Sequence, residues 1–225
     1  YVGLRYDAFF SQIPVNQITK SKEKVEEIIP QLPGKLIIKE FPPNRATIHT
    51  IEAHIKKCAE LGTKPDLIII DYVELLSSKR RTVDRKAEID DIYVSTKGLA
   101  KELKLPIWSV SQVNRAGARD DIIEGDKAAG SYDKLMITDF CASLSRKAKD
   151  KLSGTGRFHI IKNRYGVDGL TFGAKINTSV GDFEIHKYDA EDMEAALERN
   201  QNQNQGDYSN YEKKYLKEQF FNLNP

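Results

Sequence analysis

The chain has 225 residues, of which 40% are hydrophobic and 30% are charged. This composition excludes a wholly disordered chain, and the length suffices for one large domain or two small ones. The 35 basic and 33 acidic residues leave a net charge of only +2, so any affinity for nucleic acid depends on where the charges lie. Residues 189–225 carry 8 acidic and 4 basic side chains, so a mildly basic body over residues 1–188 precedes an acidic tail.

Nothing in the sequence suggests association with a membrane. No stretch approaches the roughly 18 consecutive apolar residues of a membrane helix, and Tyr1 to Tyr6 lacks the form of a signal peptide. The two cysteines, Cys58 and Cys141, form no Cys-x-x-Cys pair, which favours a reducing compartment. We therefore expect a soluble protein of the cytoplasm, or of the host cytoplasm if it is viral.

The first half of the chain alternates between helical and strand patterns. Short helical patterns over residues 3–12 and 20–29 precede an apolar segment, Lys35 to Glu40, that is typical of a strand. A helix is expected from Ile48, and Gly62 is expected to end it.

Two apolar runs further along predict neighbouring strands. Leu67 to Ile70 is continuous and lacks alternation, which is typical of a strand buried on both faces of a parallel sheet. A long helix from Val83 to Leu103 leads to a second run from Pro106 to Ser111, in which Trp108 is expected to lie in the core. This strand, helix and strand succession predicts an α/β fold.

The second half of the body reads as a series of strands joined by hairpin-length loops. They are expected over residues 139–144, 157–162, 172–177 and 183–186, so the sheet would start parallel and end in antiparallel edge strands. The tail, residues 189–225, is expected to contain a helix over residues 190–199, an Asn/Gln-rich linker and an amphipathic helix over residues 208–221. Its apolar end could dock a polymerase or a helicase loader. The alternative is a disordered tail.

Polar residues follow the two predicted parallel strands at their carboxyl ends, where α/β sheets bind ligands. Asp71 ends the first run, and an acid there would orient water on a Mg²⁺ held by nucleotide phosphates. Gln112 follows the second run, where it would reach a γ-phosphate and report its presence to the next loop. A capping Asp and an ordinary surface loop are the alternatives for these two positions.

A basic pair follows a later strand, in the segment Lys162-Asn163-Arg164-Tyr165-Gly166. An Arg fixed at a strand end offers a planar cation with several donors, which suits a phosphoryl oxygen and the role of an arginine finger. The alternative is a solvated pair of cations.

These three elements in this order resemble the RecA-like motor domain of DnaB-type replicative helicases, and bacteriophage helicases of the T-even type in particular. The similarity covers about Lys35 to His186. It implies a RecA-like three-layer α/β fold with a mostly parallel central sheet and antiparallel edge strands, incomplete at its N-terminus.

The resemblance also implies roles for single residues. Asp71 would be the Walker-B acid, holding Mg²⁺ through water, and Gln112 would sense the γ-phosphate of ATP. Lys162 and Arg164 would act on the ATP of a neighbouring subunit, so catalysis would require a ring, expected to be a homo-hexamer.

Basic loops would line the central channel of that ring and contact single-stranded DNA. Lys127 and Gly130 match the phosphate-contacting Arg and the backbone-donating Gly of the family's channel loop, whereas Ala128 replaces its Glu. These cations would contact DNA phosphates without recognising the base sequence. The alternative is that they are ordinary solvated basic loops. The remaining DNA-binding candidates follow the first two motifs: Lys79, Arg80, Arg81, Asn114, Arg115 and Arg119.

The sequence contains no Gly-x-x-x-x-Gly-Lys-Ser/Thr phosphate loop. The only glycines with its spacing, Gly125 and Gly130, are followed by Ser131-Tyr132. In the family that the chain resembles, this loop and the catalytic Glu lie upstream of the position of Tyr1. We therefore expect a fragment of a motor domain, inactive alone, in preference to a degenerate motor.

The leading hypothesis is an ATP-dependent replicative DNA helicase that translocates on single-stranded DNA as a hexameric ring. A primase, a helicase loader or a DNA polymerase would be its further partners. The alternatives are a RecA-like recombinase or other RecA-family ATPase, and a non-catalytic assembly or binding module. Strand-exchange activity would favour the recombinase, and a phosphate loop upstream of Tyr1 would exclude the module.

Overall fold

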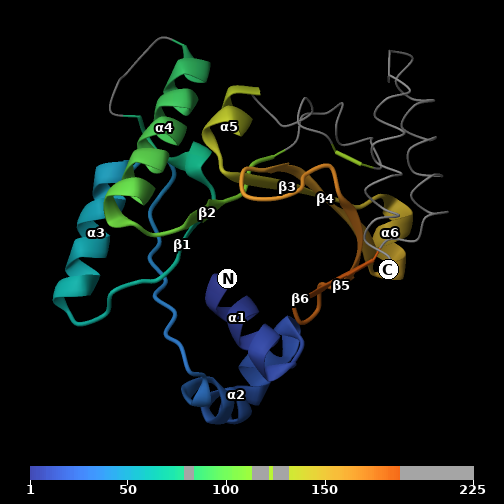
Figure 1. Cartoon of the computed structure of the whole chain (residues 1–225). Coiled ribbons are helices and arrows are strands. Elements are labelled where there is room, and N and C mark those ends of the chain that lie inside the picture. Colours follow the sequence, from blue (N-terminus) through green and yellow to red (C-terminus); the bar gives the residue numbers. More distant parts are fainter. Residues whose placement is uncertain (79–83, 113–121, 124–131, 188–225) are drawn as a thin grey trace, which may run out of the picture.

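The computed structural model describes residues 1–78, 84–112, 122–123 and 132–187 (Figure 1). Its amino-terminal part is a small helical unit of α1 (Val2–Ser11) and α2 (Lys22–Ile28), with 3-10 turns at Val15–Ser21 and Ile29–Gln31. The buried residues of this unit are Ala8, Ile18 and Val25.

Helix α3 (Ile48–Glu60) begins and ends where local sequence signals place its ends. Thr47 and Thr50 cap each other, because each hydroxyl accepts from the other's backbone N–H, at 3.3 and 3.1 Å. After the helix, Gly62 adopts a φ of +82°, and its N–H donates to a carbonyl of the last helical turn. The helix end predicted at Gly62 is therefore confirmed.

The first two strands form a parallel pair that is covered by helices. Strand β1 (Ile68–Ile70) pairs with β2 (Ile107–Ser109), and α4 (Arg85–Leu103) connects them. Helices α3 and α4 lie on the same side of this pair (Figure 1) and enclose the larger core with it. The buried core residues are Ala46, Ile48, Ile55, Ile70, Val73, Leu76, Ile92 and Leu99.

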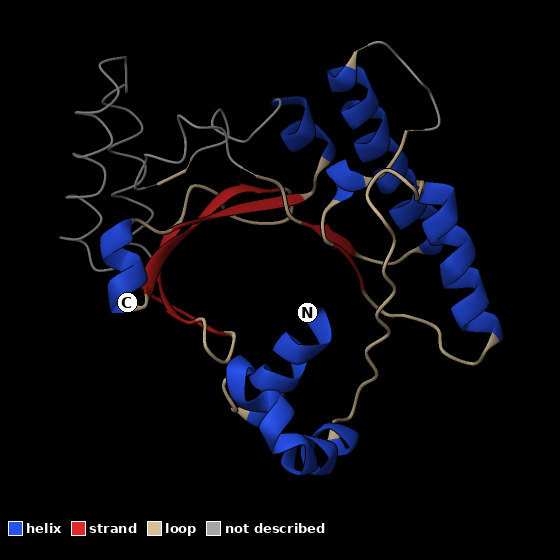
Figure 2. Cartoon of the chain, turned by 180° about the vertical axis from the view of Figure 1, so that it is seen from behind, coloured by secondary structure: helices blue, strands red, loops and turns tan. Residues whose placement is uncertain are grey.

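The remaining described strands form an antiparallel sheet in chain order, β3-β4-β5-β6. Two short helices, α5 and α6, lie before and after β3, and the brevity of each, six residues, explains why no periodic pattern predicted them. Strands of both sheets follow one curved band in Figure 2. The bounds are α5 (Tyr132–Ile137), β3 (Phe140–Ser145), α6 (Ala148–Ser153), β4 (Thr155–Asn163), β5 (Thr171–Asn177) and β6 (Asp182–Lys187). The predicted combination of parallel and antiparallel strands is confirmed.

Three expectations about the strands are wrong. Residues 35–40 form no strand in the described structure, because they pair with none of the described strands and an apolar segment becomes a strand only by pairing. The first parallel strand is not buried on both faces either, since the side chain of Ile69 is 69% exposed. Trp108, expected in the core, packs against Phe140 with ring centroids 5.7 Å apart but is 54% exposed.

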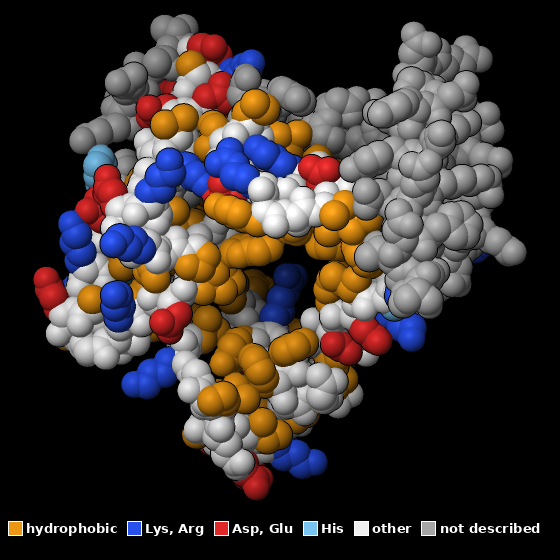
Figure 3. Space-filling view, in the orientation of Figure 1, with side chains coloured by type: hydrophobic (Ala, Val, Ile, Leu, Met, Phe, Trp, Pro, Cys, Tyr) orange, Lys and Arg blue, Asp and Glu red, His pale blue; other side chains and the backbone are white. Residues whose placement is uncertain are grey.

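Other large hydrophobic side chains of the two sheets are exposed as well. Figure 3 shows a hollow in the middle of the molecule that is bordered by hydrophobic side chains. Large hydrophobic residues with about half of their surface exposed lie on both sheets: Ile69, Trp108, Leu144 and Ile185. Exposed apolar surface of this extent is typical of interaction sites.

Within the described residues, no helix combines the length and the apolar character needed to cross a membrane. The tail predicted from residue 189 onward lies outside the described residues, so its separation from the body stays a prediction.

Candidate functional site

Asp71 and Gln112 lie at the same edge of the parallel pair, as predicted. Parallel pairing places Ile70 opposite Ser109, so both chains leave the pair at its carboxyl edge. The hydroxyl of Ser109 donates to the carbonyl of Ile70 at 2.8 Å and accepts from the backbone N–H of Val73 at 3.1 Å. This hydroxyl fixes the turn that carries Asp71, and both Asp71 and Gln112 are exposed beside it.

Glu74, which the sequence reasoning missed, organises this edge. It lies in the 3-10 turn Val73–Leu75 that follows Asp71. Its Oε1 accepts hydrogen bonds from Ser111 Oγ at 2.6 Å, Tyr93 Oη at 2.8 Å and Lys134 Nζ at 2.9 Å. The side chains of Glu74 and Lys134 are only 13% and 8% exposed, so they form a buried ion pair.

The hydrogen bonds of this cluster determine its protonation. Burial alone would raise the pKa of Glu74, but the donors Ser111, Lys134 and Tyr93 together lower it below the ordinary value. Burial, and donation to Glu74, raise the pKa of the Tyr93 phenol. At neutral pH, therefore, Glu74 is an anion and Tyr93 a neutral donor.

The basic pair Lys162 and Arg164 lies at the end of β4, as predicted, but each cation is held by a different group. Lys162 Nζ donates to the carbonyls of Leu135, at 2.6 Å, and Met136, at 3.1 Å. These two residues lie in the last turn of α5, where a cation is favourable because carbonyls are left without partners in the helix.

Arg164 is held by Asp139, which precedes β3. Its backbone N–H donates to the Asp139 carbonyl at 2.9 Å, and its Nη1 lies 3.0 Å from Asp139 Oδ1. Lys97 of α4 pairs with the other carboxylate oxygen. The hydrogen bond from Lys97 is the largest cause of the lowered pKa of Asp139, and Arg164 adds to it. The Arg164 side chain is half exposed, at 50%, so a further anion can reach it.

The structure thus brings the predicted residues together as two pairs, and α5 contacts Glu74, beside the first pair, and Lys162 of the second. Lys134 of α5 binds Glu74 on one side, and the carbonyls at the end of α5 receive Lys162 on the other. In the sequence, Glu74 is visible only as an acid three residues after Asp71, in Asp71-Tyr72-Val73-Glu74. Acids are common in turns, so this spacing alone does not indicate a functional residue. The predicted DNA-binding residues lie outside the described part of the chain: Lys79, Arg80, Arg81, Asn114, Arg115, Arg119, Lys127 and Gly130.

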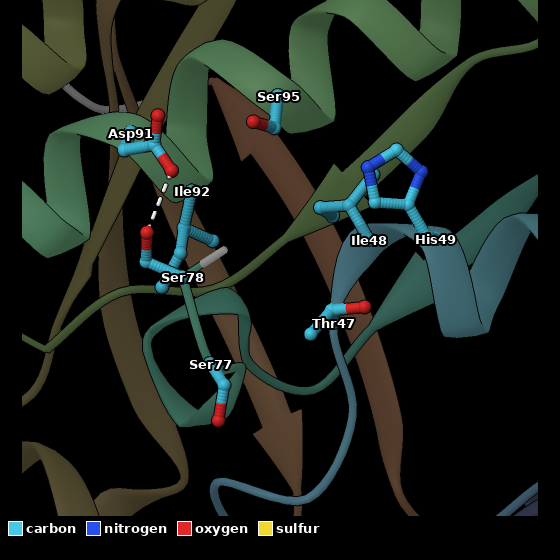
Figure 4. Close-up of a pocket in the computed structure, with 8 residues that line it drawn as sticks. All are labelled: Thr47, Ile48, His49, Ser77, Ser78, Asp91, Ile92 and Ser95. Atoms are coloured by element: carbon cyan, nitrogen blue, oxygen red, sulfur yellow. Dashed lines mark hydrogen bonds between the residues drawn. The ribbon is translucent and has the colours of Figure 1, made fainter. Parts of the chain in front are cut away.

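A separate polar pocket of about 240 Å³ lies between the start of α3 and the middle of α4 (Figure 4). At one side of it Ser78 Oγ donates to Asp91 Oδ2 at 2.7 Å, and Thr47, which caps α3, and His49 of α3 line the other side. The two predicted pairs are not among its described lining residues, so this pocket is distinct from the candidate site.

Comparison with models of known protein families shows which family the chain belongs to. Residues 10–122, half of its length, match the model of the DnaB-like helicase C terminal domain. The chain belongs to this family. The match includes Asp71, Glu74 and Gln112, and so covers the whole edge of the parallel pair.

The DnaB relatives match parts of the chain. Replicative DNA helicase DnaB of Mycobacterium intracellulare is 38% identical over 120 residues, which are 49% of this chain and 20% of that protein. The DnaB of Rhodothermus marinus is 41% identical over 64 residues, 27% of this chain and 7% of that protein. A probable plasmid replicative DNA helicase of Chlamydia psittaci is 26% identical over 129 residues, covering 54% and 28%. The chain thus spans less than a third of each of these three relatives.

Comparison with solved structures confirms the RecA-like fold. The structure of a DnaB-like replicative helicase and its interactions with primase superposes with a TM-score of 0.68 at 18% identity, covering 83% of this chain and 47% of that one. A second solved structure, that of an ATPase domain, gives a TM-score of 0.66, also at 18% identity, covering 82% and 69%. The particular likeness to bacteriophage helicases of the T-even type stays a prediction.

Proposed function

We propose that the chain is part of the motor of an ATP-dependent replicative DNA helicase. The observation that carries this proposal is the exposed pair Asp71 and Gln112 at the carboxyl edge of a parallel strand pair, in a member of the DnaB-like family. That edge is where open α/β sheets bind their ligands. The relatives that match the chain are named as replicative DNA helicases, and their activity supports the same assignment here.

In this proposal the ligand of the edge is ATP with Mg²⁺. Mg²⁺ usually keeps several waters and binds one or two carboxylates together with substrate phosphates, which fits the single exposed carboxylate of Asp71. Among the described residues, no group of three or more acidic, His or Cys side chains offers a complete protein cage for a metal. Asp71 would hold the ion through water, and the Gln112 amide would contact the γ-phosphate.

The phosphate-binding loop would come from polypeptide outside these 225 residues. The sequence has no Gly-Lys-Ser/Thr loop, and apolar side chains of both sheets, such as Ile69 and Trp108, have more than half of their surface exposed, which is typical of a surface that binds other polypeptide. A strand and helix that carry the loop would supply the phosphate-binding residues and would also cover these apolar side chains. We accordingly expect the 225-residue chain to be inactive by itself.

Lys162 and Arg164 would act in trans, on the nucleotide of a neighbouring subunit in a homo-hexameric ring. The half-exposed Arg164 guanidinium supports this role, because it remains reachable while Asp139 holds it. Its planar array of donors fits the oxygens of a transferring phosphoryl group.

Single-stranded DNA would pass through the ring and meet the predicted basic residues, from Lys79 to Arg81 and from Asn114 to Gly130. Primase is a further candidate partner, because the solved DnaB-like helicase was described with its primase interactions. A helicase loader or a DNA polymerase, and a cytoplasmic location, complete the proposal. Residues 1–188 would be the motor part, and residues 189–225 a tail outside it.

The direct test uses a form of the protein that also carries the phosphate-binding loop, and measures ATP hydrolysis with and without single-stranded DNA. Asp71→Asn keeps the side-chain shape and removes the charge that orients the metal-bound water. We expect it to lower kcat about a hundredfold or more. Asp66→Asn is the matched control, because Asp66 is an exposed acid before the same strand. Equal rates for Asp71→Asn and the control would contradict the proposed function.

A further inference from the structure

The buried carboxylate of Glu74 binds parts of three other segments through one oxygen atom. Ser111 after β2, Tyr93 of α4 and Lys134 of α5 all donate to Oε1, at 2.6 to 2.9 Å. Lys134 Nζ also lies 3.5 Å from Ser111 Oγ and 5.2 Å from the centre of the Tyr93 ring. Three donors on one oxygen fix the relative positions of the segments that carry them.

A cluster of this kind is a costly way to stabilise a fold. Removing an ammonium and a carboxylate from water carries a desolvation penalty that their attraction roughly cancels, and apolar residues of the same volume often stabilise as well or better. Glu74 Oε2 moreover has no hydrogen-bond partner among the described residues, although it is buried. Stability is therefore a weak reason for an ion pair here, whereas fixed geometry is a good one.

The geometry that Glu74 fixes includes both residues of the proposed nucleotide edge. Glu74 lies in the turn directly after Asp71, and its partner Ser111 is the residue before Gln112. The carboxylate therefore ties the turn that carries the metal-orienting acid to the strand end that carries the sensor.

The same carboxylate reaches the basic pair through α5. The side chain of Lys134 in α5 binds Glu74, and the carbonyls of the next two residues, Leu135 and Met136, accept from Lys162. Two residues after the end of the helix, Asp139 pairs with Arg164. A displacement of α5 would thus move the partners of Lys162 and Arg164 together.

We propose that Glu74 is a positioning residue whose ion pair with Lys134 holds α5 as the link between the nucleotide edge, Asp71 and Gln112, and the basic pair Lys162 and Arg164. This inference rests on the proposed function, because it concerns the geometry of ATP hydrolysis. Glu74 acts through its neighbours and contacts neither nucleotide nor metal.

Steady-state ATP hydrolysis tests the proposal in a form of the protein that also carries the phosphate-binding loop. Glu74→Gln is nearly isosteric and removes the charge that holds Lys134. We expect kcat to fall about tenfold while the KM for ATP changes less than about twofold, because misplaced groups affect the reacting geometry more than phosphate binding. Glu52→Gln is the matched control: Glu52 makes an ion pair with Lys56 at the surface of α3, and we expect unchanged kinetics.

A double-mutant cycle separates a shared role from two unrelated defects. Lys134→Met removes the other charge while keeping a long side chain. If the two residues act through their contact, the double variant Glu74→Gln, Lys134→Met will be no slower than the slower single variant. Multiplying defects, or a kcat for Glu74→Gln equal to that of Glu52→Gln, would overturn the proposal.

Hydrogen exchange on the 225-residue chain supplies a readout that needs no catalysis. Glu74→Gln should speed amide exchange in α5 and also near Lys162, whereas Glu52→Gln should change neither region. Faster exchange confined to the turn around Glu74 would refute the link through α5. A wild-type protein that carries the loop but hydrolyses no ATP would instead refute the proposed function, and this outcome is distinct from a failure of the exchange test.

Discussion

Charge organises the candidate site at the scale of single residues. Asp139 carries two cations, Lys97 and Arg164, and the lowered pKa of its carboxyl keeps it ionised well below neutral pH. In the proposed ring, a phosphate of the neighbouring nucleotide would compete with Asp139 for Arg164. The pairing therefore gives the Arg164 side chain a defined position before any nucleotide is present.

His159 of β4 yields a prediction about stability and pH. Its Nδ1 lies 2.9 Å from Thr171 Oγ1, and burial lowers its pKa from 6.5 to about 4. Between about pH 4 and 6.5, the unfolded chain therefore binds a proton at His159 that the folded chain does not bind. The contribution of the neutral imidazole to the free energy of unfolding is complete above about pH 6.5 and is lost as the pH falls toward 4. We expect the free energy of unfolding to fall by up to about 3 kcal/mol across this window in urea titrations.

The control for this prediction compares two histidine variants. His159→Gln should remove most of the pH dependence, whereas His49→Gln, at a largely exposed site with a 60% exposed side chain, should keep it. If the free energy of unfolding falls equally with pH in His159→Gln and in the wild type, groups other than His159 cause the pH dependence.

At the scale of elements, replacing glycine by alanine is expected to change the stability of the fold in opposite directions at two positions. Gly62, after α3, has a φ of +82° and Gly98 lies inside α4, and a Cβ at either residue would meet no atom within 4 Å. Gly62→Ala should destabilise by about 1 to 2 kcal/mol, because an L side chain disfavours this left-handed conformation. Gly98→Ala should stabilise by about 1 kcal/mol, because it lowers the cost of ordering a helical residue. Thermal unfolding of both variants checks the signs, and a stabilising Gly62→Ala would contradict the helix ending described for α3.

The elements that the sequence predicted are those with strong local patterns. Helix α3 has an apolar period and a closing glycine, and β1 is a run of Ile residues, so both lie within a residue or two of the expected bounds. The segment 35–40 has the same apolar character as β1 but no described partner strand, and pairing cannot be read from one segment alone. Asp71 and Gln112 could be located because they end patterned strands. Glu74 could not, because its role depends on residues 19 to 60 positions away.

At the scale of the whole molecule, the two sheets leave large apolar side chains exposed within a RecA-like fold. The fold superposes on that of a DnaB-like helicase, yet the chain spans only 20% of the DnaB of Mycobacterium intracellulare. The strand motifs could be read from the sequence because they are continuous. The arrangement of Lys162 against α5 could not, since it joins segments that only the fold brings together.

In the proposed ring, one catalytic site takes Asp71 from one subunit and Arg164 from its neighbour. The most direct test mixes two defective variants, Asp71→Asn and Arg164→Ala, in forms of the protein that also carry the phosphate-binding loop, and measures ATP hydrolysis stimulated by single-stranded DNA. Random mixing leaves about a quarter of the interfaces with both residues intact when the Arg acts in trans. We predict that the mixture recovers hydrolysis that neither variant has alone. A mixture no more active than the average of its two components would contradict the shared site.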